Sequence, residues 1–180
     1  MTDSRACEHS VWLVPDTASS ALFTEEIASL VTATGGTPFM PHITMAGDLT
    51  GSPGATQELC RAMSGSLAPF EATVSAIVAG PQVFMSLFLD LTVPAHVAVA
   101  RQQLCARLGL SAAPAWRPHI SLAYGVEPGP EKEAIRARLE HAHRGRSIPI
   151  RDVVVAHSSA TQAIDRWRVI SRFRLGEAAL

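Results

Sequence analysis

One short motif occurs twice in this chain, and it constrains the fold more than any other feature of the sequence. The segment PHITMA at 41–46 is matched by PHISLA at 118–123, and a glycine follows each segment, at Gly47 and Gly125. The predicted helices around Leu59 and Ile135 repeat at nearly the same offset as the two motifs. A motif that recurs inside a repeated element order indicates two related halves.

Short apolar strands alternate with amphipathic helices in the predicted element order. Strands are predicted at 10–14, 42–46, 70–78, 83–91, from 119 onward, 148–156 and 166–175, and helices at 17–34, 59–67, 97–108 and 135–142. Strand–helix–strand units with hairpins predict an α+β fold, with two antiparallel sheets facing a central cleft and helices outside. We expect a single domain over 1–180 made of two pseudo-symmetric lobes, with flexible tails at 1–8 and 176–180.

The composition limits the classes of protein to which this chain can belong. With 180 residues, 47% of them hydrophobic and 17% charged, it is typical of one globular domain. A net charge of −1 argues against a protein that coats nucleic acid. No apolar run is long enough for a membrane span, the charged N-terminus does not resemble a secretory signal, and three scattered cysteines suggest neither disulfides nor zinc. A monomer in the cytoplasm is therefore expected.

The duplicated motif carries groups suited to phosphoryl chemistry. In a strand, residues two apart share a face, so His42 lies with Thr44 and His119 with Ser121. If both pairs face one cleft, one imidazole can accept a proton from water while the other donates one to a leaving oxygen. The hydroxyls can bind phosphoryl oxygens. These two histidines and two hydroxyls therefore predict hydrolysis of a phosphodiester without metal or cofactor. His42 and His119 are the predicted catalytic residues, and Thr44 and Ser121 are predicted to bind the phosphate.

The two motifs resemble the H-x-[T/S] pair of the 2H phosphoesterase superfamily. The segments SVWLVP at 10–15, FMPHIT at 39–44 and PHISLAYG at 118–125 resemble the cyclic phosphodiesterases of plants and yeast. This resemblance implies a bilobal fold and the opening of ribose cyclic phosphates to a monoester. The implied substrates are nucleoside 2′,3′-cyclic phosphates and ADP-ribose 1″,2″-cyclic phosphate, with His119 as the base and His42 as the acid.

The resemblance also implies an aromatic wall for the substrate. Tyr124 matches one such residue, although strict alternation would place it on the face opposite His119 unless the strand ends or bulges there. Phe84 is a second candidate for the wall. The alternative for both residues is packing in the core, which is the usual role of a strand aromatic.

Three other functions stay open at this level. One is an RNA 2′,3′-cyclic phosphodiesterase, similar to 2′-5′ RNA ligases, that acts on RNA ends with the same residues. Another is a catalytically silent module that binds cyclic phosphates or RNA. A metallohydrolase is the weakest alternative, because no cluster of carboxylates and histidines is visible in the sequence.

The remaining histidines and a cluster of arginines have structural interpretations. Because His141 and His143 are two apart on a predicted helix, they point in different directions and do not form a metal pair. They are expected on the solvated surface, as are His9, His96 and His157. The basic cluster of Arg136, Arg138, Arg144, Arg146 and Arg151 is expected to form an exposed face, although it could bind phosphate or RNA.

Overall fold

The computed structural model describes residues 8–110 and 116–177. The strands are β1 (His9–Pro15), β2 (Ile43–Leu49), β3 (Phe70–Ala79), β4 (Leu87–Thr92), β5 (His119–Ala123), β6 (Ser147–His157) and β7 (Arg168–Arg174). The helices are α1 (Thr17–Thr34), α2 (Pro53–Ser66), α3 (Ala95–Arg107) and α4 (Pro130–His143), with 3-10 turns η1 (Val83–Met85) and η2 (Ile164–Arg166). Most lie within a few residues of the predicted ranges; within 83–91, however, η1 precedes a strand that starts only at Leu87.

The element order repeats, as the sequence predicted. The first half runs β1-α1-β2-α2-β3 and the second runs β4-α3-β5-α4-β6. Helices α2 and α4 start at Pro53 and Pro130, and strands β3 and β6 start at Phe70 and Ser147, so both pairs are 77 residues apart. The segment η2–β7 follows the second half and lies outside the repeat.

The two halves share one sheet, and the prediction of two separate sheets is wrong. The strand order is β2-β1-β6-β3-β4-β5, and β7 pairs with β6. The last strands of the two halves join directly, because residues 70–73 of β3 pair antiparallel with residues 147–150 of β6. A hydrogen-bonded ladder therefore runs across the boundary between the halves.

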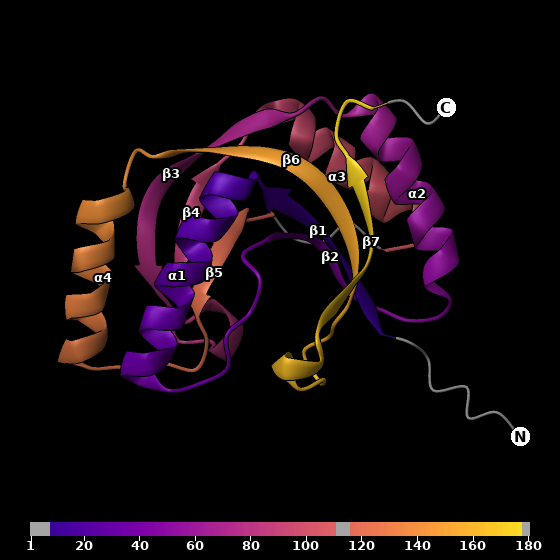
Figure 1. Ribbon diagram of the computed structural model, residues 1–180. Coiled ribbons are helices and arrows are strands. Elements are labelled where there is room, and N and C mark those ends of the chain that lie inside the picture. The colour runs from indigo at the N-terminus through magenta and orange to yellow at the C-terminus, as the bar shows by residue number, and fades with distance from the viewer. Residues whose placement is uncertain (1–7, 111–115, 178–180) are drawn as a thin grey trace, which may run out of the picture.

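The sheet is strongly curled, and its curvature positions the two motifs (Figure 1). Strands β2 and β5, which start at or beside the motif histidines, occupy opposite ends of the strand order. They nevertheless contact one another, because the sheet arches into a half-barrel that brings its ends together. The motifs thus meet by curvature of a single sheet.

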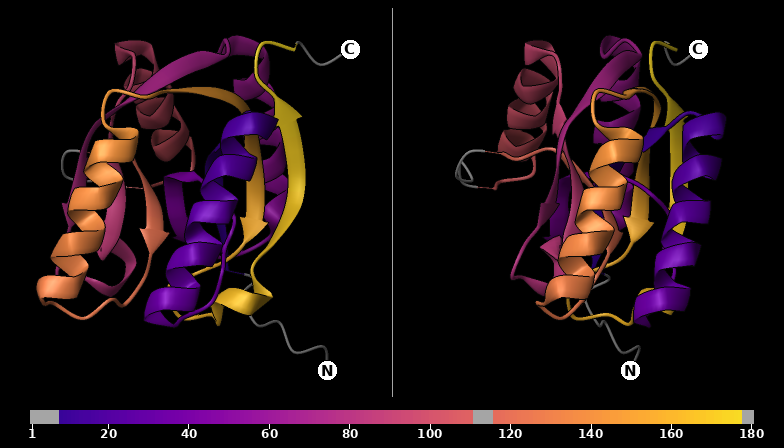
Figure 2. Two further views of the ribbon diagram at one scale, coloured as in Figure 1. Left: turned by 60° about the vertical axis from the view of Figure 1, so that its left-hand side comes forward. Right: turned by 90° about the vertical axis from the view of Figure 1, so that its left-hand side faces the viewer.

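The helices lie in two pairs, α1 beside α4 and α2 beside α3 (Figures 1 and 2). Asp16 caps the start of α1, because its carboxylate accepts a hydrogen bond from the Ser19 amide at 2.8 Å. Gly35 caps the end of the helix with a φ of 80°, which favours glycine. The main core includes Val11 and Leu13 of β1. Alternation in β1 turns Trp12 to the other face of the sheet, where it packs in a second cluster.

The tails predicted at 1–8 and 176–180 fall mainly outside the described residues, which exclude 1–7 and 178–180. Glu8 accepts hydrogen bonds from the Ser159 and Thr161 hydroxyls. The Gly176 amide donates to the Ser64 carbonyl at 2.8 Å. Both described ends are therefore held against the body of the protein.

Two of the histidines expected on the surface are buried, so that prediction is wrong for His9 and His143. Nε2 of His9 lies 2.8 Å from the Thr56 hydroxyl. His143 lies on the face of α4 that packs against α1, where its Nε2 is 3.3 Å from a Glu26 carboxylate oxygen. His96 and His141 are exposed, as expected, and half-buried His157 contacts the Glu8 carbonyl through Nδ1 at 2.9 Å.

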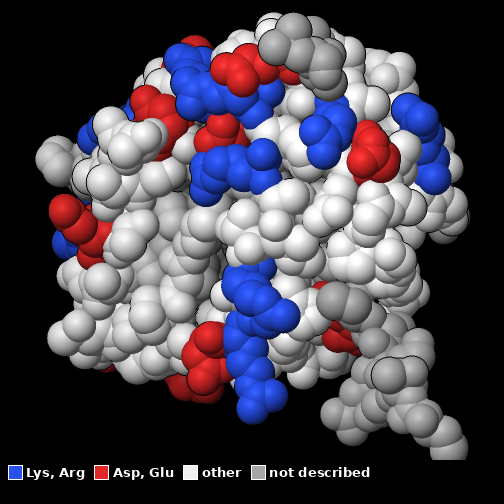
Figure 3. Space-filling model, turned by 45° about the vertical axis from the view of Figure 1, so that its right-hand side comes forward, with Lys and Arg blue, Asp and Glu red and all other residues white. Residues whose placement is uncertain are grey.

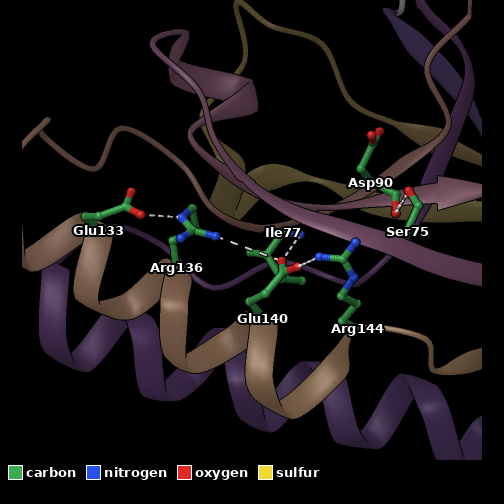
Figure 4. Close-up of polar contacts among 7 residues, drawn as sticks. All are labelled: Ser75, Ile77, Asp90, Glu133, Arg136, Glu140 and Arg144. Atoms are coloured by element: carbon green, nitrogen blue, oxygen red, sulfur yellow. Dashed lines mark hydrogen bonds and ion pairs between the residues drawn. The ribbon is translucent and has the colours of Figure 1, made fainter.

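The arginines of the predicted basic cluster are largely neutralised by carboxylates. Arg136 of α4 and Arg144, which directly follows that helix, both pair with Glu140. Arg138 pairs with Glu26, and Arg151 pairs with Glu71. Figure 4 shows Glu140 between its two arginines and beneath β3, where it also accepts the Ile77 amide at 2.6 Å. The cluster therefore ties α4 to β3 and offers few free positive charges to an anion.

Glu140→Gln is expected to lower the free energy of unfolding at pH 7 by about 1 kcal/mol or less, since solvent screens a side chain that is 21% exposed. The Ile77 amide, followed by Arg144, lowers the pKa of Glu140 in the folded protein. A carboxyl whose pKa is lowered by folding stabilises above its unfolded pKa, and this contribution disappears as pH falls through the folded pKa. Thermal unfolding should therefore separate the two proteins more at pH 7 than at pH 3; an equal difference at both pH values would contradict this role.

Candidate active site

A cavity of about 290 Å³ on the face opposite the main core brings the two motifs together. His42 and Thr44 line it from the start of β2, and His119 and Ser121 line it from β5. The remaining lining residues are aromatic (Trp12, Phe84, Tyr124, Trp167), hydroxylic (Ser10, Ser158, Ser159) or of other types (Gly47, Asp48, Met85, Ala160). The four residues predicted from the motifs therefore share one cavity.

His42 lies immediately before β2, and its ring is fixed on two sides. Nδ1 donates a hydrogen bond to the Met40 carbonyl at 2.7 Å, and the ring stacks on Trp12 with 3.8 Å between centroids. Because a carbonyl can only accept, the neutral ring carries its proton on Nδ1 and leaves Nε2 as an acceptor. Burial, reinforced by the nearby His119, lowers the pKa of His42 to about 4.

His119 begins β5 and has a similar tautomer but a different electrostatic environment. Its Nδ1 donates to the Arg117 carbonyl at 2.9 Å, and its ring meets the edge of Phe88 at 5.1 Å between centroids. Burial lowers the pKa of His119, whereas Asp90, its cross-strand partner in β4, acts in the opposite direction. Arg117 holds both oxygens of Asp90, at 2.8 and 3.0 Å.

The two motif hydroxyls differ in their present partners. Ser121 donates to the Phe84 carbonyl at 3.2 Å. Within residues 8–110 and 116–177, no hydrogen bond engages the Thr44 hydroxyl, and this residue is half-buried beside the cavity. Thr44 is thus ready to donate to a ligand, while Ser121 must first release the Phe84 carbonyl.

Both predicted wall residues line the cavity. Tyr124 reaches it because β5 ends at Ala123, so the alternation that would have turned the ring away no longer applies. Its ring stacks on Phe39 with 4.1 Å between centroids and meets Phe84 edge-on at 5.1 Å. Burial raises the pKa of Tyr124 to about 12, so its hydroxyl remains a donor at neutral pH.

Two further aromatic residues of the cavity, Trp12 and Trp167, were not predicted. Trp12 lies directly opposite Thr44 in the β1–β2 pairing, and alternation with Val11 and Leu13 could have indicated that it faces the site. Trp167 follows η2, outside the duplicated halves, so the repeat gave no signal for it. The centroids of the Phe84 and Trp167 rings lie 6.3 Å apart across the cavity wall, with 22° between their planes.

The cavity carries little fixed charge. Its described lining includes no lysine or arginine, and Asp48 is the single carboxylate there. One oxygen of Asp48 accepts the Ala160 amide at 2.8 Å. Across all described residues, the cavity included, no group of three histidine, cysteine or acidic side chains is arranged to hold a metal ion. The same residues include no helix of the length and apolarity that a bilayer span requires.

Comparison with known proteins places this fold and motif pair in one family. The sequence matches the 2′-5′ RNA ligase superfamily over residues 25–161. A cyclic phosphodiesterase of Arabidopsis thaliana is 26% identical over 167 residues, which cover 91% of this chain and 92% of the relative.

Solved structures share the fold at low sequence identity. TT0787 of Thermus thermophilus matches with a TM-score of 0.63 and 16% identity, over 94% of this chain and 98% of its own. LigT of E. coli, solved in complex with 3′-AMP, matches with a TM-score of 0.58 and 15% identity, over 96% of this chain and 100% of its own. The chain belongs to the 2′-5′ RNA ligase superfamily, the 2H phosphoesterases.

Proposed function

We propose that this protein is a cyclic phosphodiesterase that hydrolyses ribose cyclic phosphates to a phosphomonoester. The observation that carries this proposal is that both H-x-[T/S] pairs line one cavity, with Nδ1 of each imidazole held by a backbone carbonyl. Each ring therefore has Nε2 left for the substrate. The similarity to a cyclic phosphodiesterase over nearly the whole chain supports the same reaction.

The reaction needs one proton acceptor and one proton donor on opposite sides of phosphorus. Water attacks phosphorus as one imidazole takes its proton, and the bond to a ribose oxygen breaks as the other imidazole protonates that oxygen. Thr44 and Ser121 donate hydrogen bonds to the non-bridging oxygens, and an imidazolium stabilises the charge that develops there. The product is a ribose monoester with a restored hydroxyl.

Within this mechanism we assign His119 as the base and His42 as the acid. Asp90 lies opposite His119 and stabilises the imidazolium that forms when this ring takes the proton of water. His42 has a pKa of about 4, so this ring takes up a proton from solvent when the anionic substrate binds beside it and raises its pKa. Once protonated, the ring with the lower pKa is the stronger acid toward the leaving oxygen.

A substrate with sulfur in place of the departing ribose oxygen tests this division, because a thiolate leaves without protonation. We expect His42→Ala to regain much of its lost rate on this substrate, on the order of a hundredfold relative to the oxygen substrate. His119→Ala should regain little, because it lacks the group that activates water. Rescue of His119→Ala instead of His42→Ala would reverse the assignment.

The pKa shifts also predict the pH dependence of kcat/KM, which reflects the free enzyme. One ring must be protonated and the other neutral, and both pKa values lie below the usual 6.5, with that of His42 at about 4. The maximum of kcat/KM should therefore lie between about pH 4 and 6.5, while bound anion moves the optimum of kcat upward. A kcat/KM maximum above about pH 7.5 would contradict this account.

The substrate we favour is a small nucleotide-like molecule. LigT has been solved with 3′-AMP, ATP and NADP+, so a fold of this type accepts nucleotides. The aromatic walls formed by Phe84, Tyr124 and Trp167 offer flat apolar surfaces to a base. On the face drawn in Figure 3, most basic side chains are scattered among acidic ones, and one short strip of basic side chains runs below the centre.

A substrate panel in a chelator tests the proposed function against its alternatives. We expect conversion of a nucleoside 2′,3′-cyclic phosphate, followed by phosphorus NMR, to continue with the chelator present. A strong preference for an oligonucleotide cyclic phosphate, lost steeply at high salt, would favour action on RNA ends. Tight binding without turnover at any pH would favour a silent binding module.

A further inference from the structure

The two motifs have aromatic neighbours at matching places in the two halves of the fold. Trp12 of β1 lies opposite Thr44 in the first half, and Phe88 of β4 lies opposite Ser121 in the second. The duplicated fold has therefore placed an aromatic residue on the strand beside each catalytic histidine.

The two aromatic rings contact their histidines in different ways. The indole of Trp12 stacks face to face on His42, with 3.8 Å between ring centroids and 16° between ring planes. The Phe88 ring is inclined by 61° to the His119 ring, and the Arg117 guanidinium lies over the Phe88 ring at 5.0 Å. In the described part of the chain, His42 thus lies flat on an aromatic face and His119 does not.

The position of the Trp12 ring is set by the sheet. The residue is 4% exposed and lies between Thr44 of β2 and Val154 of β6. On the cavity side of the sheet, Trp12 packs in a small cluster with Val14, Val154 and Ala156. This packing fixes the indole face against the imidazole.

The face of an indole attracts a cation, because the π electrons give it a partial negative potential. Burial, reinforced by His119, lowers the pKa of His42 to about 4, so the imidazolium needs a stabilising contact. No carboxylate pairs with His42 among the described residues, whereas Asp90 acts on His119. The contacts that favour a protonated His42 are therefore the Trp12 face and the Met40 carbonyl.

An indole suits this position better than a carboxylate would. Because the phosphodiester is anionic, a carboxylate beside His42 would repel the substrate. A carboxylate would also hold the proton of the imidazolium tightly, which makes the ring a weaker acid toward the leaving oxygen. The indole stabilises the imidazolium by a smaller amount and brings no net charge into the cavity.

Resting on the function proposed above, we propose that Trp12 is a positioning residue for His42, whose indole face stabilises the imidazolium that protonates the leaving ribose oxygen. The proton passes from Nε2 of His42 to this oxygen as the bond between phosphorus and oxygen breaks, and the neutral ring stays stacked on Trp12. Trp12 itself gains and loses no proton. Asp90 has the corresponding role for His119, so the two halves stabilise their imidazolium ions by different means.

The test compares Trp12→Leu with the wild type on a nucleoside 2′,3′-cyclic phosphate and on its analogue with sulfur in place of the departing ribose oxygen. Because a thiolate leaves without protonation, loss of the stack should matter for the oxygen substrate alone. We expect kcat/KM to fall about tenfold on the oxygen substrate and by less than about twofold on the sulfur substrate. Equal losses on both substrates would overturn the proposal, since a role in binding or folding does not depend on the leaving atom.

Trp167→Leu is the matched control. Trp167 lines the same cavity, but its ring lies 6.4 Å from that of His42 with 68° between the planes, so it offers no stacking face. This control should change both substrates by the same factor. Trp12→Phe decides the question if Trp12→Leu does not fold: a phenyl face attracts a cation less strongly than an indole, so kcat/KM should fall about threefold, again on the oxygen substrate alone.

An NMR titration of the His42 ring gives a second readout that a purely structural role would not move. His119 is the titratable group that acts on His42 among the described residues, and Asp48, the carboxylate of the cavity, accepts the Ala160 amide. Loss of the stack removes a contact that favours the imidazolium, so the pKa of His42 should fall in Trp12→Leu. An unchanged or higher pKa would contradict the proposal.

The outcomes separate this proposal from the proposed function. If the wild type converts both substrates and Trp12→Leu slows them equally, Trp12 does not act through His42, and the cyclic phosphodiesterase function stands. If the wild type converts neither substrate, the proposed function itself fails.

Discussion

Replacing His42 or His119 by alanine is expected to lower kcat on a nucleoside 2′,3′-cyclic phosphate by at least about a thousandfold. Each ring is proposed to move one of the two protons on which the reaction depends, and the rings share one cavity. Because the two groups act as a unit, the double replacement should be little worse than either single one. Initial rates by phosphorus NMR, with circular dichroism to verify the fold, give the comparison.

His141→Ala is the matched control for these variants. His141 is an exposed histidine of α4 and does not line the catalytic cavity, so its loss should leave kcat within about twofold of the wild type. Removal of His42 also removes a stacking partner of Trp12, so the melting temperature of each variant must be measured beside its rate. A folded His42→Ala or His119→Ala protein with wild-type kcat would end the two-histidine account.

Lys132→Met is expected to lower the free energy of unfolding by about 2–4 kcal/mol and to raise KM. Lys132 is the single lysine of the sequence, and it is buried in α4. Its ammonium donates three hydrogen bonds. The acceptors are the Gly80 carbonyl at 2.8 Å, the Val126 carbonyl at 2.8 Å and the Ser86 hydroxyl at 3.0 Å. Methionine fills the space of the stem but leaves these acceptors without their donor.

KM is expected to rise because Lys132 connects two segments of the wall of the catalytic cavity. Gly80 and Ser86 flank the segment that carries Phe84, and Val126 follows Tyr124 by two residues, so the ammonium holds two parts of the cavity wall together. Glu131→Met, at an exposed neighbouring position of α4, controls for the methionine itself. Denaturant unfolding gives the stability; a midpoint equal to that of the wild type would contradict this role of Lys132.

The sequence predicted the elements and the meeting of the motifs because both follow from local periodicity and an internal repeat. Val11 and Leu13 follow the period of a strand, and Asp16 and Gly35 bound the first helix through local chemistry. The pairing of β3 with β6 was missed because it joins chain segments that are far apart, and periodicity carries no information about which strands become neighbours.

The parts of the site that sequence analysis missed depend on tertiary packing. Trp167 comes from the segment after the second half, and it reaches the cavity because β7 folds back along β6. His143 is buried by its contact with α1, and Lys132 by the loops around its ammonium. Neither burial follows from the residue type, since histidine and lysine are usually at least partly exposed.

The most direct test of the central claim is hydrolysis of a nucleoside 2′,3′-cyclic phosphate in ¹⁸O-labelled water with a chelator present, followed by phosphorus NMR. We expect a single monoester whose signal carries the shift of one ¹⁸O atom, formed by the wild type and absent with the double replacement of His42 and His119 by alanine. Equal conversion by that double variant, or no conversion by the wild type at any pH, would contradict catalysis by two imidazoles on one phosphate.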